Sequence, residues 1–416
     1  MKKFRPFLDV QTETDSAAEQ GSAGKRGRIR CILYCTTHFL LRHLLFLQIG
    51  FDQRISATAR TGFAQGRRTV FLQNDLNQVK GANKMKDLFH HTYTVKGENG
   101  RFRPVRFTDK QMDLLEKISP VFGSLGRCTA GVSLKFYTDA EEISFHFKYT
   151  ILYTNTGGFD VYENNVMYCS IELPEESCES VFTYRKTAAG KTLIEIFFPA
   201  NAEVEVWDLK LGDHTPFFSS NGGFILYYGD SITQSAYMKT PSLSFPSLVS
   251  ILTGAQYLNR GVGSLFYDES YLDENDSLKP DVVFVEFGAN DLVKHDAGNK
   301  VVMVDNIAQH CDADDIPVLI QRAEKYLTKL KAIYPTAKIN VISPLYSCEQ
   351  TSQAFASVKI AYKTELHALV DKLGLSFIDG THLSAHIPEC HVQDGIHLTA
   401  LGNALVAQSL IHILRK

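Results

Sequence analysis

The stretch FILYYGDSITQS, residues 224–235, decides the fold of the C-terminal half of this 416-residue chain. Its first five residues are apolar or aromatic without interruption, which is typical of a strand buried on both faces of a sheet. The run ends on Gly229, Asp230 and Ser231. A small turn residue, an acid and a hydroxyl therefore follow the predicted strand directly. The role of these three residues depends on the segments that the fold brings near them.

The rest of the C-terminal half contains further apolar runs of this kind, and segments with helical spacing separate them. Continuous apolar runs recur at 281–287 and 338–343, while apolar side chains at 318–334 and 354–373 recur with helical spacing. Strands that alternate with helices predict a parallel sheet with helices on both sides. We therefore expect an α/β domain over residues 223–416.

Residues 85–213 follow a different pattern, with a period of two. The segment GVSLKF at 131–136 alternates apolar and polar side chains, as half-buried antiparallel strands do. Asn164-Asn165 separates two further alternating runs and predicts a tight hairpin. We expect an all-β, jelly-roll-like sandwich here, followed by a linker at 212–223, where Gly, Pro and Ser gather.

The first 84 residues differ from both regions. They carry 14 Lys and Arg but 6 Asp and Glu, whereas the whole chain has a net charge of −3. They contain a linker-like stretch and show no consistent period. We expect residues 1–84 to be a basic extension that is either disordered or not native to the protein, and in the second case Met85 is the natural start.

Composition limits the partners and the compartment. The small net charge gives no global attraction to nucleic acid. The apolar stretch at 31–51 is interrupted by His38, Arg42 and His43, which argues against a membrane span. Eight cysteines without CxxC spacing are typical of buried thiols in a reducing compartment. The expected location is therefore cytoplasmic.

Ser231 lies where open parallel sheets form their binding sites, just past the carboxyl end of a predicted strand. A helix that begins there would direct backbone N–H groups and the positive end of its dipole toward the hydroxyl. This environment suits a nucleophile whose attack produces an oxyanion. Taken alone, however, Asp-Ser at a helix start is usually just an N-cap. The stretch is also not a G-x-S-x-G nucleophile turn, because Thr233 replaces the second glycine.

An activated serine also needs oxyanion donors, and two segments offer them. FGAND, 287–291, ends a predicted strand with Gly288, where the backbone can approach a ligand closely, and with the amide donor Asn290. LNRGVGSLF, 258–266, is a glycine-rich turn after a short apolar stretch. Each segment alone is also consistent with a plain loop.

The C-terminal segment offers the base and the acid that orients it. In QDGIHL, 393–398, Asp394 comes three residues before His397 and just ahead of an amphipathic helix. A tight turn would let the carboxylate hold one ring nitrogen while the other nitrogen faces the serine. The groups follow the chain order Ser, Asp, His, and we expect them to converge at the strand ends.

Together these segments resemble the signature blocks of the SGNH (GDSL-type) hydrolases. The matching residues are G-D-S at 229–231, N-x-G-V at 259–262, G-x-N-D at 288–291 and D-x-x-H at 394–397. The resemblance covers about 223–414 and implies a flavodoxin-like three-layer α/β/α fold. The preceding β-sandwich makes the chain similar to the two-domain members of this superfamily, such as carbohydrate esterases.

The resemblance also implies a role for each site residue. Ser231 is the nucleophile, His397 the base and Asp394 the acid that orients the base. The oxyanion hole uses the backbone N–H of Ser231, a backbone N–H of the second block and the side chain of Asn290.

The second block departs from the family pattern. The family usually has glycine where this chain has Ser264, and Gly263 comes just before it. If the site requires a positive φ, serine is strained there. Either the backbone is ordinary at Ser264, or Gly263 takes the role of donor.

We thus expect a serine esterase that hydrolyses a small acyl ester, for instance an acetyl ester of a carbohydrate, without a metal or an organic cofactor. Two alternatives stay open: a glycan-binding module with a degenerate catalytic domain, and an acyltransferase that uses the same serine. A metal site is a further alternative, although the spacing of its candidate ligands matches no common zinc pattern; these are His382, His386, Cys390, His391 and His397. The sequence does not set the oligomeric state.

Overall fold

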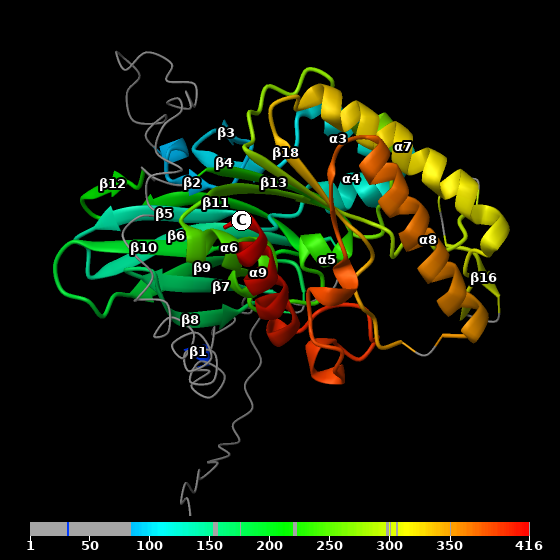
Figure 1. Ribbon diagram of the computed structural model, residues 1–416. Helices are drawn as coiled ribbons and strands as arrows, with labels where there is room; N and C mark the ends of the chain where they lie inside the picture. The colour runs from blue at the N-terminus through cyan, green and yellow to red at the C-terminus, as the bar shows by residue number, and fades with distance from the viewer. Residues whose placement is uncertain are drawn as a thin grey trace, which may run out of the picture.

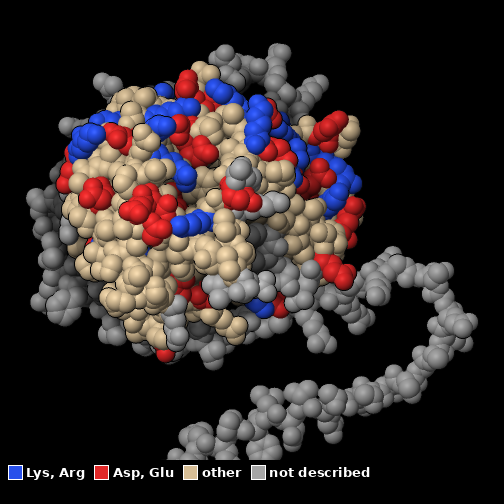
Figure 2. Space-filling view, turned by 90° about the vertical axis from the view of Figure 1, so that its right-hand side faces the viewer, with Lys and Arg blue, Asp and Glu red and all other residues tan. Residues whose placement is uncertain are grey.

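The computed structural model describes residues 85–152, 157–174, 176–218, 223–296, 299, 301–304, 307–349 and 351–415, together with the backbone of strand β1 (Cys31–Ile32). Apart from β1, the predicted basic extension lies outside the described residues. Among the described residues, no helix is both long and apolar enough to cross a membrane. On the face shown in Figure 2, basic and acidic side chains are interspersed over the upper part rather than separated by sign.

The C-terminal half is built on a five-stranded sheet in which every pairing is parallel. Its order is β14-β13-β15-β18-β19, which in chain order is the 2-1-3-4-5 arrangement of flavodoxin-like folds. The order reverses between the first and third strands of the sheet, β13 and β15. The strands are β13 (Phe224–Gly229), β14 (Gln256–Gly261), β15 (Val282–Glu286), β18 (Lys338–Ile342) and β19 (Ser376–Ile378).

Helices cover both faces of this sheet, because its strands carry apolar side chains on both faces. Leu226 and Tyr228 face a core shared with α7 and α8, whereas Ile225 and Tyr227 face a core shared with α6 and α9. Figure 1 shows the three layers. The helices are α5 (Ser231–Gln234), α6 (Phe245–Thr253), α7 (Ile316–Ile333), α8 (Gln353–Lys372) and α9 (Ala400–Leu414). A short hairpin, β16 (Met303–Val304) with β17 (Ile307–Ala308), lies between β15 and α7.

The N-terminal region contains two antiparallel sheets that share one apolar core. One sheet has the order β1-β8-β7-β10-β5-β12, with β2 also paired to β5, and the other has the order β3-β4-β11-β6-β9. The predicted hairpin is confirmed: Asn164 and Asn165 have φ of 50° and 65°, and Glu163 pairs with Val166. The strands are β2 (Phe89–His90), β3 (Thr94–Glu98), β4 (Arg101–Val105), β5 (Ser133–Thr138), β6 (Glu142–Ile151), β7 (Gly158–Glu163), β8 (Val166–Glu172), β9 (Cys178–Arg185), β10 (Thr192–Phe197), β11 (Ala202–Lys210) and β12 (His214–Pro216).

The predicted fold class, a flavodoxin-like three-layer α/β/α domain preceded by an all-β sandwich, is confirmed, with two local differences. Residues 109–126 form helices α3 (Asp109–Ile118) and α4 (Pro120–Gly126) instead of strands, and both pack into the core beside the parallel sheet. A capping box between Thr108 and Gln111 starts the first of them. The predicted linker also differs, because its residues 214–216 form edge strand β12.

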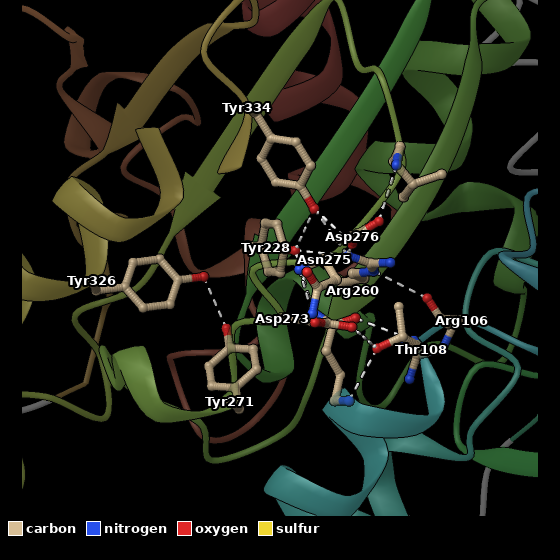
Figure 3. Close-up of polar contacts among 12 residues, drawn as sticks. Arg106, Thr108, Tyr228, Arg260, Tyr271, Asp273, Asn275, Asp276, Tyr326 and Tyr334 are labelled. Carbon is tan, nitrogen blue, oxygen red and sulfur yellow. Dashed lines mark hydrogen bonds and ion pairs between the residues drawn. The ribbon is translucent and has the colours of Figure 1, made fainter. Parts of the chain in front are cut away.

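A buried polar cluster joins this helical segment to the parallel sheet (Figure 3). Strand β14 is an edge strand, so its outer carbonyl groups have no neighbouring strand. Arg106 takes that place: its guanidinium donates to the carbonyls of Asn259 and Gly261 at 2.7 and 2.9 Å, and to those of Leu125 and Cys128 at 3.0 and 2.6 Å. The side chain is 1% exposed. Burial lowers the pKa of Arg106 to about 10, so the group stays charged at neutral pH.

Arg260 extends the same cluster from the next position of β14. Its guanidinium donates to the Arg106 carbonyl at 3.1 Å, forms an ion pair with Asp276, and donates to the hydroxyls of Tyr228 and Tyr334 at 2.7 and 3.1 Å. The two arginines therefore fix β14 immediately before the glycine-rich turn at 261–264.

Candidate active site

Ser231 lies at the point where the strand order of the parallel sheet reverses. β13 ends at Gly229, and Asp230 caps the following turn by accepting the N–H of Ile232 at 2.9 Å. The helix that follows differs from the expectation: α5 is a single turn that ends at Gln234, because Ser235 is left-handed with φ 71°. A macrodipole from so short a helix is weak, so individual N–H groups dominate the local electrostatics.

Glycines allow this turn to lie against the neighbouring strands. A Cβ on Gly229 would come within 2.2 Å of the Thr233 hydroxyl and 2.6 Å of the Glu286 carbonyl oxygen. A Cβ on Gly261 would meet the backbone nitrogen of Gln234 at 2.3 Å. Any side chain at either position would push Ser231 away from the strand ends.

The structure brings Ser231, His397 and Asp394 together as one hydrogen-bonded chain. His397 Nε2 lies 2.8 Å from Ser231 Oγ, and His397 Nδ1 lies 2.6 Å from Asp394 Oδ2. The serine and histidine are separated by 166 positions in the sequence. Ser231 is 7% exposed, and the imidazole of His397 is 13% exposed. A substrate carbonyl can therefore reach a hydroxyl that already has a proton acceptor.

The loop before α9 holds the acid in position. Asp394 Oδ1 accepts the backbone N–H groups of Ile396 and His397 at 2.8 and 2.9 Å. Partial burial acts to raise the pKa of Asp394, but these bonds and the bond from the imidazole outweigh it and lower the pKa below its usual value. The carboxylate thus stays ionised, and it orients the ring so that Nε2 faces the serine.

The structure gives the backbone conformation of the second block. Ser264 has φ 63°, so the prediction of an ordinary backbone there is wrong. The alternative donor, Gly263, already donates its N–H to the side-chain oxygen of Gln234 at 2.6 Å. Among the described residues, no protein acceptor pairs with the N–H of Ser231 or Ser264. These two N–H groups are therefore candidates for binding a ligand oxygen.

The left-handed conformation of Ser264 gives a prediction for Ser264→Gly. Glycine adopts this conformation without the strain that serine carries, and it keeps the same N–H. We expect the free energy of unfolding in urea to rise by about 0.5–1 kcal/mol, while kcat changes less than about twofold. Ser235→Gly is the matched control, because Ser235 is also left-handed and lies outside the glycine-rich turn at 261–264. A tenfold loss of kcat in Ser264→Gly alone would show that the serine side chain itself takes part.

Asn290 faces the same turn. Its amide nitrogen lies 3.1 Å from Asp230 Oδ2 and 3.3 Å from the Leu265 carbonyl oxygen. These two acceptors orient the amide toward the region of Ser264. An oxyanion bound there would compete with them for the amide hydrogens of Asn290. Gly288 has φ 123°, and a Cβ there would come within 2.4 Å of Pro344. Gly288 therefore acts through the backbone and makes room for the turn that carries Asn290.

A model of the GDSL-like lipase/acylhydrolase family matches residues 227–405. This span includes Ser231, Asp394 and His397. Residues 227–405 form a GDSL-like acylhydrolase domain. The protein is thus an enzyme of the class that hydrolyses ester bonds. Comparison with curated protein sequences gave no match.

Solved structures share the fold over both regions of the chain. The salicylyl-acyltransferase SsfX3 of a tetracycline biosynthetic pathway has a TM-score of 0.61 at 16% identity, covering 77% of this chain and 92% of its own. A GDSL-like lipase from Bacteroides ovatus has a TM-score of 0.59 at 17% identity, covering 79% and 94%. The acetyl xylan esterase Est2A from Butyrivibrio proteoclasticus has a TM-score of 0.52 at 13% identity, covering 79% and 95%.

Three buried acids lie beneath the acylhydrolase site: Asp230, Glu286 and Asp291, each 2% exposed or less. Burial first, and then the nearby Asp230 carboxyl, raises the pKa of Glu286 well above its usual value. Burial likewise raises the pKa of Asp230, and it raises that of Asp291 to about 6. Glu286 Oε2 accepts the Thr233 hydroxyl at 2.9 Å. Glu286 was not predicted as a site residue, although an acid inside a largely apolar strand is a visible signal in the sequence.

This cluster predicts a dependence of stability on pH. Because the folded-state pKa of Glu286 lies above its unfolded value of about 4.3, its contribution to stability is present at low pH and is lost as pH rises through the folded-state pKa. Glu286→Gln removes this titration. We expect its thermal midpoint to rise relative to that of the wild type as the pH increases above about 4.3 and through the folded-state pKa of Glu286. Glu365→Gln, at an exposed position of α8, is the control, and a parallel shift of both variants would contradict the assignment.

The candidate metal ligands have other contacts. His386 stacks on Tyr346 with ring centroids 4.0 Å apart, and His391 Nε2 lies 2.9 Å from the Tyr346 carbonyl oxygen. His382 is exposed near Asp379. Within the described ranges, no group of three or more His, Cys, Asp or Glu side chains is placed to hold a metal ion.

Proposed function

We propose that the protein is a serine esterase that removes a small acyl group, such as acetyl, from a carbohydrate ester, with Ser231 as the nucleophile. The observation that carries the proposal is the 2.8 Å contact between Ser231 Oγ and His397 Nε2, continued by the 2.6 Å contact to Asp394. This arrangement is what a weak nucleophile needs in order to react at neutral pH.

In the first step, Ser231 Oγ attacks the ester carbonyl carbon while His397 Nε2 takes the hydroxyl proton. Asp394 keeps the other proton on Nδ1 and stabilises the imidazolium that forms. The carbonyl π electrons move onto oxygen, and the tetrahedral intermediate carries a negative charge.

Hydrogen-bond donors stabilise this charge. The backbone N–H groups of Ser231 and Ser264 are two such donors, and the Asn290 amide is the third. Asn290 shares its hydrogens with Asp230 and Leu265 in the free enzyme through long bonds of 3.1 and 3.3 Å. We expect one of these bonds to weaken as the oxyanion forms.

Collapse of the intermediate breaks the bond to the alcohol, which receives the proton from His397 as it leaves. A water molecule then attacks the acyl-serine, with His397 again as the base, and the acid and the free serine result. If a second alcohol reaches the acyl-serine before water, the same site acts as an acyltransferase.

The substrate class is supported by the structural neighbours, which include an acetyl xylan esterase and other carbohydrate esterases of family 2. All of them are less than 20% identical to this chain, so they support the choice of first substrates to test. The assembled chain of serine, histidine and aspartate argues against a degenerate catalytic domain. Cytoplasmic location remains part of the proposal, on the grounds of the dispersed cysteines.

The test is hydrolysis of p-nitrophenyl acetate, butyrate and octanoate, with Ser231→Ala as the control. We expect the highest kcat/KM for acetate, and a fluorophosphonate adduct on Ser231 in the peptide mass spectrum. Adding methyl glucoside as an acceptor separates transfer from hydrolysis by its acetylated product. A wild type that is no faster than Ser231→Ala on every ester, and that takes up no probe, would refute the proposal.

A further inference from the structure

Tyr237 is an aromatic side chain beside the base that the steps above do not use. Its ring centroid lies 4.6 Å from that of the His397 imidazole, with an angle of 56° between the planes. The residue is 40% exposed. One part of the side chain therefore contacts the imidazole while another part faces solvent at the mouth of the site.

The backbone at Tyr237 is unusual. Its φ is 65°, and Ser235, two residues earlier, has φ 71°. A left-handed conformation is rare for a bulky residue and persists only where the surroundings enforce it. Ala236 and Met238 are 2% and 5% exposed. The strained turn thus buries both neighbours and leaves the tyrosine ring between them at the surface.

Contacts from both regions of the protein fix this loop. Asn403 of α9 donates to the sulfur of Met238 at 3.5 Å. From the β-sandwich, Asp160 accepts the backbone N–H of Ser242 at 2.8 Å, and the Tyr162 hydroxyl donates to the Ser242 hydroxyl at 3.0 Å. The segment that carries Tyr237 is therefore held between α9 and β7, which explains how it keeps a strained backbone.

We propose that Tyr237 determines specificity for the alcohol part of the substrate, by forming a flat surface against which a sugar ring lies. This inference rests on the proposed esterase function. The departing alcohol must lie near His397 Nε2 in order to receive its proton, so a ring in contact with this imidazole faces the alcohol and not the acyl group. An aromatic face suits the C–H face of a pyranose, whose hydroxyl groups stay in water at the edge.

The experiment compares two substrates with the same acyl group: methyl 6-O-acetyl-glucopyranoside and ethyl acetate. In Tyr237→Leu, which keeps an apolar side chain but removes the flat ring, we expect kcat/KM for the sugar ester to fall about five- to tenfold. Ethyl acetate should change less than about twofold. Tyr237→Phe should retain the sugar preference, because the ring carries it. Tyr168→Leu is the control, since Tyr168 is a 46% exposed tyrosine on β8 of the sandwich.

The outcomes separate this inference from the proposed function. An equal loss on both esters would show that Tyr237 acts only by positioning His397, and an unchanged ratio in Tyr237→Leu would show that it has no role in selecting the alcohol; either result overturns the inference. If the wild type hydrolyses neither ester, the proposed function fails, and this inference fails with it.

Discussion

His397→Ala should lose about 10⁵- to 10⁶-fold in kcat on p-nitrophenyl acetate, and adding Ser231→Ala to it should cost almost nothing more. The imidazole is the proton acceptor 2.8 Å from the serine hydroxyl. Without it, the hydroxyl must lose its proton to water, and the serine is then no better than any other alcohol. The two residues act as one unit, so either single replacement removes the whole effect.

The measurement is single-turnover hydrolysis by the two single variants and by the double variant. His382→Ala is the matched control, because the side chain of His382 is 78% exposed on the same stretch of chain. We expect this control to stay within about twofold of the wild type. Losses that multiply in the double variant would mean that Ser231 and His397 act independently, which would contradict the geometry.

Much of the fold could be predicted because its signals are local. The continuous apolar run at 224–228 is typical of a strand buried on both faces, and its alternation with segments of helical period indicates a parallel sheet. The Asn164-Asn165 turn is equally local, since both residues tolerate a positive φ. The convergence of Ser231 with His397 followed from the rule that sites form at the carboxyl ends of parallel strands.

The features that the sequence did not predict depend on contacts between distant segments. Helices α3 and α4 lie between alternating β segments, and they form because Leu115, Phe122 and Leu125 are buried beside the parallel sheet. The length of α5 is set by Ser235, whose φ of 71° has no sequence signal as clear as a glycine. Tyr237 likewise reaches His397 only through this left-handed turn.

The donor in the second block shows how a known pattern can leave a choice open. The sequence offered Gly263 and Ser264, and glycine is the better residue for a left-handed backbone. The structure nevertheless places the positive φ at Ser264, and Gly263 donates its N–H to the side chain of Gln234. The bond from Gly263 joins residues 29 positions apart, so the sequence gives no direct signal of it.

Arg106→Met should lower the free energy of unfolding by about 3–5 kcal/mol, because it removes one cation from four buried carbonyl groups. Methionine fills much of the same volume, so the loss would come from the unpaired carbonyls and not from a cavity. Two of these carbonyls belong to Asn259 and Gly261, on the outer side of edge strand β14. The guanidinium of Arg106 thus provides the hydrogen-bond donors that a neighbouring strand would otherwise provide to β14.

Urea denaturation measures the effect, with Arg103→Met as the matched control. Arg103 lies on β4, three residues before Arg106, and forms a partly exposed ion pair with Glu203 at 2.8 Å, so its loss should cost less than about 1 kcal/mol. Arg106→Lys should be intermediate, because an ammonium has three donors for four acceptors. A loss below about 1 kcal/mol in Arg106→Met would mean that water or a shifted side chain replaces the guanidinium. A loss in the expected range would mean that the glycine-rich turn at 261–264 depends on the segment before α3.

We would then also expect residues 223–416, expressed alone, to expose the edge of β14 and to lose both solubility and esterase activity.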